Sequence, residues 1–556
     1  MIPGQKRVSV ALGLLGLFAL FLVWQLFSRD WSLPGLGFRL PAPNVLPSWP
    51  YVEVVSPLNE ETWPYRVFKS SPLNPPNISI GISHSRLADG YLFLTPGSRG
   101  IHRGEQQNGP HIITPANELV YASPSRTSTH FNGFRVQRWE QAPCLTFWRG
   151  DIVAGRGYGD LVLLDDEYRE TSVSLQADIR HSPLLRHVPG LMDFHEQELT
   201  PRNTVLVTAY NETSVDLSPI GGLSNGTVTD SMFFEVDMGT GQVLFSWSAL
   251  DLFPITSSRL PIVSNLSAVQ ADTSYDAFHI NSVQLVGQDY LISSRHHWAV
   301  YLVSGEDGHV IWTLGGDSHD ASDFGPLPVP GQFRWQHDVR AHNVTEHDML
   351  LSLFDNHCRA TEVCTRASRG LLIRLRLPPD RRQVPEVVRS IDAGDAKQAP
   401  SQGNFQIELQ HGNQLASYGP VPVVREFGPP EHGSPLLWEG RFGHDDFAQS
   451  YRAYKSPWHA TPRDWDPSLV LVQQGGRQGA GQRVVHGHVS WNGATDVERW
   501  NVYMKHPMQK RRTLYAVTAK MGFETVFELA LPDDTCVQVA AVQAGHEVRL
   551  SNVACL

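Results

Sequence analysis

Hydrophobic residues occur along most of this chain in short runs that alternate with polar positions, and Gly, Pro, Asn and Asp separate the runs. A hydrophobic period of two residues is the pattern of half-buried β-strands, and no long segment has the period of an amphipathic helix. The 556 residues include 46 Gly, 39 Pro and 15 Trp, which also favours short strands and turns. From about Tyr51 onward, the pattern therefore predicts an all-β protein.

The N-terminus breaks this pattern. Lys6 and Arg7 precede an apolar run over residues 8–27, which ends at a Ser-Arg-Asp sequence without a small-residue cleavage site. About 20 apolar residues span a bilayer as a helix, whereas a cleaved signal peptide has a shorter apolar core. We therefore expect residues 1–28 to form an N-terminal transmembrane helix that acts as an uncleaved signal anchor.

The charges before this helix set its expected orientation. Positive flanks stay cytoplasmic, which predicts a single-pass membrane protein with the bulk of the chain in the secretory lumen or outside the cell. Residues 29–50 are rich in Pro and Gly and are expected to form an extended linker. Acceptor sequences for N-glycosylation fit a lumenal glycoprotein and begin at Asn77, Asn211, Asn225, Asn265 and Asn343.

The five cysteines suit an oxidising compartment, where disulfides persist. Cys358 and Cys364 are close enough in sequence to close a loop, and Cys536 and Cys555 can join two strands near the C-terminus. Cys144 is left over. Because sequence does not fix the pairing, five free thiols remain the alternative.

A diverged repeat recurs in the strand pattern. Residues 238–251, 304–317 and 434–443 each combine a Gly with an alternating strand that carries a Trp. We interpret each copy as the end of one four-stranded unit, which is typical of a β-propeller. At this spacing, residues 51–462 hold about six blades. A large sandwich or two separate β domains is the alternative.

The last part of the chain, residues 467–556, has six or seven further strand patterns. Its segment VSWNGATDVERWNVYM (489–504) resembles the Trp-bearing strand and partner of a fibronectin type III-like or immunoglobulin-like β-sandwich. We expect this C-terminal domain to pack or bind, without chemistry of its own. The net charge of −11, with no long basic block, also argues against nucleic acid as a partner.

Polar residues interrupt the apolar strands between residues 275 and 356. His279, Asn281, Arg295 and His337 each lie within or beside a segment that otherwise has the composition of a buried strand. Buried polar groups are costly unless they are paired. Several of them on successive strands therefore predict a site where strand ends converge.

Several short motifs also follow one another in order: MDFHE (192–196), FHINSV (278–283), LISSRHHWAVYLV (291–303), FRWQHDVR (333–340), LSLFDN (351–356) and QSYRAYKSPW (449–458). Together they resemble the arylsulfotransferase family, especially its eukaryotic and fungal branch, over about residues 90–460. The resemblance implies a six-bladed β-propeller, in agreement with the repeat. It implies that His337 is the catalytic histidine. It also implies that the substrate-binding residues are His279, Asn281, Arg295 and His195.

The implied reaction moves a sulfuryl group from a small aryl sulfate to a phenolic acceptor through a sulfohistidine at His337, with ping-pong kinetics. A neutral imidazole meets less repulsion from an anionic ester than a carboxylate does. Arg295 offers a rigid fork of donors, and His195, His279 and Asn281 can donate hydrogen bonds to oxygen. The chain has no Walker-type loop, so neither a nucleotide sulfate donor nor a cofactor is expected.

Two other function classes stay open. His195, His279 and His337 can be arranged as the three-histidine metal site of a metallohydrolase on a propeller, although the charge of Arg295 opposes a dication there. A non-catalytic, membrane-tethered propeller scaffold is the other alternative. Asn356 is interpreted as a turn residue that ends a strand, with orientation of His337 as the less favoured role.

Overall fold

The computed structural model describes residues 43–59, 61–98, 107–124, 129–153, 155–179, 190–262, 274–317, 322–478, 482–505, 512–532 and 535–556. Within these ranges the chain forms β-strands and short 3-10 helices, and no α-helix. The 3-10 helices are η2 (Ser218–Ile220), η3 (Ile255–Ser257), η5 (Val329–Gly331), η6 (Gln410–Gly412) and η7 (Pro430–His432). The predicted all-β class is confirmed.

Most of the described chain forms successive antiparallel sheets of four strands. The first sheet contains β10 (His130–Trp139), β11 (Ala142–Val153), β12 (Arg156–Leu164) and β13 (Glu170–Val173). The second contains β14 (Gln197–Leu199), β15 (Thr204–Val215), β16 (Gly226–Asp237) and β17 (Val243–Ser248), with β18 (Tyr275–Asp276) beside β16. The third contains β19 (Ile280–Val286), β20 (Asp289–Ser294), β21 (Ala299–Val303) and β22 (Val310–Gly315).

Three further sheets continue this order. The fourth sheet contains β23 (His337–His342), β24 (Asp348–Asp355), β25 (Arg369–Arg376) and β26 (Glu386–Ile391). The fifth contains β27 (Asn404–Gln406), β28 (Gln414–Ser417), β29 (Val423–Phe427) and β30 (Leu436–Arg441), and β5 (Ser79–Ser83) extends it. The sixth contains β32 (Ala453–Ser456), β6 (Tyr91–Leu94), β8 (His111–Ile113) and β9 (Leu119–Ala122). Strands β17, β22 and β30 contain the predicted repeat, and each is the fourth strand of its own run.

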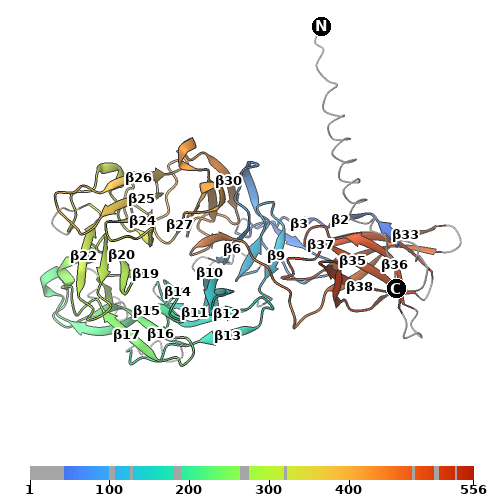
Figure 1. The fold of residues 1–556 in the computed structure, drawn as a ribbon, viewed down its shortest axis with the longest axis horizontal. Coiled ribbons are helices and arrows are strands. Elements are labelled where there is room, and N and C mark those ends of the chain that lie inside the picture. The colour runs from blue at the N-terminus through green and yellow to red at the C-terminus, as the bar shows by residue number, and fades with distance from the viewer. Residues whose placement is uncertain are drawn as a thin grey trace, which may run out of the picture.

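The sheets contact one another in sequence through their first and second strands (Figure 1). β10 contacts β14, β15 contacts β19, β19 contacts β23, and β24 contacts β27. β28 then contacts β32, and β32 contacts β10, so the contacts return to the first sheet. Because β32 pairs with β6, the last sheet combines the two ends of this region. The first strands of the sheets are therefore brought near one another, and they position the site.

The C-terminal strands form two sheets that share one core. One contains β1 (Asn44–Leu46), β36 (Arg512–Ala519), β35 (Arg499–Lys505), β38 (Cys536–Gln543), β39 (His546–Leu550) and β40 (Ala554–Cys555); the other contains β2 (Ser48–Pro50), β37 (Glu524–Leu531), β34 (Gln482–Ser490) and β33 (Ser468–Gln478). Val489 from one sheet and Trp500 from the other are both buried in this core. Two short pairs complete the strands of the described residues: β3 (Glu53–Val55) with β4 (Tyr65–Val67), and β7 (Gly97–Ser98) with β31 (Ala448–Gln449).

The end of the predicted linker differs from expectation. Residues 44–50 are not a spacer, because β1 pairs in parallel with β36 and β2 pairs with β37. Trp49 packs edge-on against His486, and Ser48 donates a hydrogen bond to the carbonyl of Ala519. The composition of residues 29–50 did not predict this strand pairing. Its Pro and Gly content indicates an extended linker, and strands of three residues are too short to show an alternating pattern.

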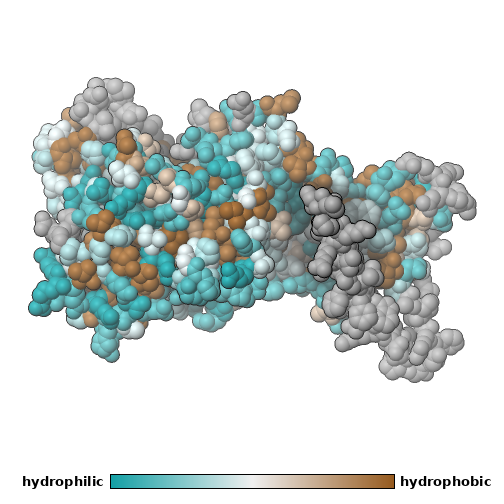
Figure 2. Space-filling model, turned by 90° about the horizontal axis from the view of Figure 1, so that it is seen from above, coloured by the Kyte–Doolittle hydropathy of each residue, from teal (hydrophilic) through white to brown (hydrophobic). Residues whose placement is uncertain are grey.

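The predicted single-pass topology is overturned. The described part of the chain contains no helix with the length and apolarity needed to cross a membrane. Residues 8–27, on which that expectation rested, lie outside the described residues. The face of the molecule in Figure 2 mixes hydrophilic and hydrophobic residues.

Cysteines and sequons can be placed individually. Cys358 is joined to Cys364 and Cys536 to Cys555, while Cys144 is free and buried. Among the glycosylation candidates, Asn225 and Asn343 are exposed. Asn77 and Asn211 are half-buried, and Asn265 lies outside the described residues.

Candidate active site

His337 begins β23 at a bulge, where the pairing with β24 shifts register between His337 and Arg340. The side chain is buried, and its Nδ1 lies 2.6 Å from the Asn356 Oδ1. The amide of Asn356 donates to the carbonyls of Ala399 and Gln402, which orients its oxygen toward the imidazole. The backbone N–H of Gln402 donates to the His337 Nε2 over 3.2 Å. These contacts require a proton on Nδ1 and a lone pair on Nε2.

The environment keeps this imidazole neutral. Burial, and after it the positive charge of Arg295, lower the pKa of His337 well below its ordinary value. A neutral ring with a bare Nε2 is the form that can act as a nucleophile.

His195 and His279 each form a pair with an aspartate. The His195 Nδ1 lies 2.5 Å from the Asp193 Oδ2, and the His279 Nδ1 lies 2.5 Å from the Asp276 Oδ2. The two imidazole centres are 4.8 Å apart. Because the Asp276 carboxylate accepts from the His279 Nδ1, the Nε2 of the neutral His279 ring is an acceptor. Burial and the neighbouring His195 lower the pKa of His279 well below its ordinary value.

Arg295 lies in the turn between β20 and β21. Its guanidinium stacks on the ring of Trp335 at 5.2 Å and donates to the Pro400 carbonyl over 3.1 Å. A second contact joins its Nη1 to the His296 Nε2 over 2.8 Å. Burial lowers the pKa of Arg295 to about 10, which still leaves it charged at neutral pH. Its Nε is buried and lacks a hydrogen-bond partner among the described residues.

Asn281 and Tyr451 complete the group. Asn281 donates from Nδ2 to the Gln336 carbonyl over 2.7 Å, and its Oδ1 has no partner in the described structure. The ring of Tyr451 lies 5.5 Å from that of His195 and 6.4 Å from that of His337. Its buried hydroxyl also lacks a partner among the described residues, and burial raises its pKa, so it remains a donor. Unpaired buried polar atoms in one place indicate a site completed by a ligand.

We call His195, His279, Arg295, His337 and Tyr451 the histidine cluster. A family model for arylsulfotransferases matches residues 135–442, more than half of the chain and including four of these five residues. The chain belongs to the arylsulfotransferase family. Membership in this family of sulfotransferases suggests an enzyme of that class, which acts on aryl sulfates and phenols. No curated protein sequence matches the chain.

Solved structures add little to this family assignment. The chain is similar to the GH43 BlXynB protein from Bacillus licheniformis, with 8% identity, a TM-score of 0.28, and coverage of 76% of this chain and 86% of that one. It is also similar to a thermostable family-43 glycoside hydrolase, with 10% identity, a TM-score of 0.23, and coverage of 62% and 100% respectively. These TM-scores are too low to support an argument about fold or chemistry.

An ionic cluster lies beside the histidine cluster of this arylsulfotransferase family member. Glu196 accepts from Arg340 at 2.5 Å and from Arg452 at 3.4 Å. Asp338 accepts from Arg340 at 2.8 Å and lies 3.5 Å from Arg452. Burial opposes the charge of Glu196, but Arg340 and Arg452 outweigh it and lower its pKa. Both carboxylate oxygens of Glu196, and the Oδ1 of Asp338, therefore bind arginine side chains.

The structure brings all five sequence-predicted site residues together, and it gives Asn356 the role that the sequence analysis favoured less. Asn356 is not merely a turn residue, because it holds the Nδ1 of His337. The sequence missed Asp193, Asp276, Gln402 and the position of Tyr451. Asp276 stands three residues before His279, a spacing that would have signalled it.

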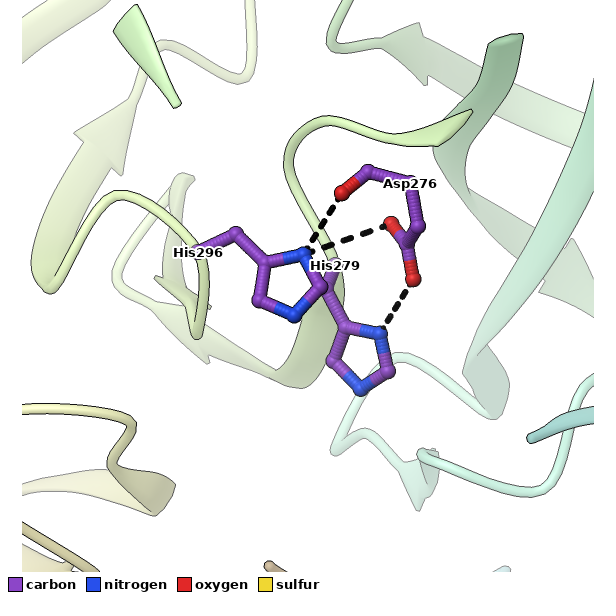
Figure 3. A group of neighbouring side chains, drawn as sticks. All are labelled: Asp276, His279 and His296. Atoms are coloured by element: carbon purple, nitrogen blue, oxygen red, sulfur yellow. Dashed lines mark hydrogen bonds and ion pairs between the residues drawn. The ribbon is translucent and has the colours of Figure 1, made fainter. Parts of the chain in front are cut away.

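One group of side chains has metal-ligand geometry, and it differs from the predicted three-histidine set. Among the described residues, Asp276, His279 and His296 have ligand atoms within 4.8 Å of one another (Figure 3). The Nδ1 atoms of both histidines already donate to Asp276. His195 and His337 are not part of this group.

Proposed function

We propose that this protein transfers a sulfuryl group from an aryl sulfate to a phenol through a sulfohistidine at His337. The observation that carries the proposal is the fixed tautomer of His337, which leaves a bare Nε2 in a neutral buried ring. The unpaired Arg295 Nε and Tyr451 hydroxyl support it, because both are donors suited to an anionic sulfuryl group.

In the first half-reaction, the Nε2 of His337 attacks sulfur and the bond from sulfur to the aryl oxygen breaks. The electron pair leaves on the phenolate, and the Nδ1 proton stays on the bond to Asn356. Negative charge on the sulfuryl oxygens is stabilised by Arg295. The Gln402 N–H, which points at Nε2 in the free protein, turns to a sulfuryl oxygen as the N–S bond forms.

In the second half-reaction, a phenol replaces the departed product. The Nε2 of His279 takes the phenolic proton, and its partner Asp276 stabilises the resulting imidazolium. The phenol oxygen attacks sulfur, the N–S bond breaks, and neutral His337 is restored. The His279 imidazolium then releases its proton to solvent, which restores the starting form of the site. Two half-reactions on one site produce ping-pong kinetics.

The same proposal includes the architecture that carries the site. We infer a six-bladed β-propeller over residues 51–462, supported by the ordered contacts of the sheets and by the return from β32 to β10. We also infer a fibronectin type III-like sandwich over residues 467–556, to which residues 44–50 contribute strands. The substrates are small aryl sulfates and phenols, with no nucleic acid partner.

The test uses the purified full-length protein with 4-nitrophenyl sulfate and phenol. We expect nitrophenolate release that depends on phenol, formation of phenyl sulfate, and loss of both in His337→Asn. His342→Asn is the matched control, because His342 lies at the other end of β23 and contacts Ser352 instead of the site. Release without phenol that a chelator stops would support a metallohydrolase. Absence of release over a panel of aryl sulfates would support a scaffold.

A further inference from the structure

Three neighbouring side chains connect the proposed base to the proposed anion-binding residue. Figure 3 shows Asp276 facing both His279 and His296. Asp276 accepts from the His279 Nδ1 through its carboxylate at 2.5 Å, and from the His296 Nδ1 through its backbone carbonyl at 2.6 Å. The His296 Nε2 then contacts the Arg295 Nη1 at 2.8 Å. One continuous hydrogen-bonded chain thus runs from His279 to Arg295.

The direction of every hydrogen bond in this chain is determined by chemistry. A backbone carbonyl accepts only, so the His296 Nδ1 carries the proton. A guanidinium donates only, so the His296 Nε2 is bare. The two requirements agree on one neutral tautomer, which leaves His296 no capacity for a proton or a substrate. Its ring therefore transmits orientation from Asp276 to Arg295.

Backbone contacts strengthen the same connection. The N–H of Arg295 donates to the His279 carbonyl over 3.0 Å, and the N–H of His296 donates to the Phe278 carbonyl over 3.1 Å. His279 itself has a left-handed φ of 55°, an uncommon conformation for a residue other than glycine. The two segments are consequently fixed to each other while the Arg295 Nε remains without a partner among the described residues.

We propose that Asp276 and His296 are positioning residues that hold His279 and Arg295 in register for a bound sulfuryl group. The inference rests on the proposed function for its substrate class. It goes beyond that function by assigning a shared support to two residues that otherwise belong to separate steps.

A metal ion at the same three residues is the competing interpretation, and the contacts oppose it. The Asp276 carboxylate and the His279 Nδ1 are 2.5 Å apart, which is a hydrogen-bond distance. The charged Arg295 lies 2.8 Å from the far nitrogen of His296. A dication would have to replace both Nδ1 protons next to a guanidinium.

The test measures binding of inorganic sulfate to the full-length protein by calorimetry, together with transfer from 4-nitrophenyl sulfate. Replacing His296 with Phe removes both of its hydrogen bonds, and we expect sulfate affinity to fall on the order of 10-fold. His296→Gln can still accept from Arg295 through its side-chain oxygen and should retain more affinity. His297→Phe is the control, because that buried ring contacts Phe253, Phe278 and Tyr301 instead.

Asp276→Leu gives the most discriminating result, because it removes the side-chain acceptor of the His279 Nδ1, which an Asn side chain would keep. Loss of a negative charge beside an anion site should tighten sulfate binding on Coulombic grounds alone, whereas loss of the positioning role should weaken it. Weaker binding in Asp276→Leu than in Asp276→Asn supports the proposal, and tighter or unchanged binding overturns it. Stoichiometric metal in the wild-type protein that is lost in Asp276→Leu would also overturn it. Sulfate binding that requires His296, without any sulfuryl transfer, would refute the proposed function but leave the positioning role intact.

Discussion

The histidine cluster and the ionic cluster are built from adjacent residues of the same segments, yet they differ in how their charged groups are paired. His195 precedes Glu196, His337 precedes Asp338, and Tyr451 precedes Arg452. In the ionic cluster the Glu196 carboxylate contacts three guanidinium groups and that of Asp338 contacts two, while the Arg452 Nε lacks a partner among the described residues. In the histidine cluster, by contrast, the Arg295 Nε and the Tyr451 hydroxyl have no partner among the described residues.

This difference separates two uses of buried polarity. In the ionic cluster the charged side chains bind one another. Because Glu196, Asp338 and Arg452 come from three separate segments, these ion pairs hold the segments together. Unpaired donors leave the protein incomplete until a ligand arrives. The comparison therefore predicts that changes to one member of each neighbouring pair affect stability, and that changes to the other affect reaction rate.

Arg452→Met should have the largest effect on stability. It leaves Glu196 and Asp338 with less compensation in a buried setting, which costs about 3–5 kcal/mol when one partner of a buried pair is removed. Urea unfolding of the full-length protein measures it. Arg169→Met is the matched control, because Arg169 and its partner Asp165 are exposed and such pairs contribute about 0–1 kcal/mol. Equal losses in both variants would contradict the distinction.

Asn356→Leu should mainly affect the rate. The variant cannot hold the Nδ1 proton of His337, so the ring is free to adopt the wrong tautomer or orientation. We expect kcat for sulfuryl transfer to fall on the order of 100-fold, with a small change in KM. Steady-state kinetics with 4-nitrophenyl sulfate measure both constants. A change confined to KM would show that Asn356 orients substrate instead of the nucleophile.

Tyr451→Phe sharpens the comparison at a single pair of neighbours. The hydroxyl has no partner to lose within the described part of the chain, so stability should change by less than about 1 kcal/mol. If it donates to the substrate, kcat/KM should fall on the order of 10-fold. Unfolding and kinetics are measured on the same preparation. Lower stability with unchanged kinetics would place this hydroxyl among the structural groups.

The sequence alone predicted the all-β class, and it predicted polar residues that the structure places near one another, because strand periodicity and polar interruptions are local signals. The partners of His337 are a different case. Asn356 and Gln402 are 19 and 65 residues away from it in sequence. Their contacts exist only after neighbouring sheets have packed, so no local pattern contains them. Asp338 and Arg452 also resemble site residues by position, and only their pairing shows otherwise.

Acid should destabilise the protein through its buried histidines. The pKa values of His337 and His279 are lowered in the folded state, whereas the unfolded chain has the ordinary value of about 6.5. Above that pH both states are neutral. Below it the unfolded chain binds protons that the folded protein does not, so stability falls as pH drops toward 5. The urea midpoint should fall less steeply in His337→Asn, while exposed His347→Asn should match the wild type.

The disulfide loop at residues 358–364 should have the smallest effect, confined to substrate affinity. Glu362 accepts a hydrogen bond from the Trp335 indole over 3.0 Å. The guanidinium groups of Arg359 and Arg295 both pack on the ring of Trp335. Replacing Cys358 and Cys364 with Ser frees this loop, so we expect KM for 4-nitrophenyl sulfate to rise by roughly two- to five-fold at constant kcat.

The matched control removes the other disulfide, because Cys536 and Cys555 join β38 to β40 away from the histidine cluster. That double Ser variant should lower the unfolding temperature and leave KM unchanged. If both double variants change KM equally, the effect comes from general loosening. If only the 358–364 variant changes it, this loop supports anion binding through Trp335, whose ring contacts both Arg359 and Arg295.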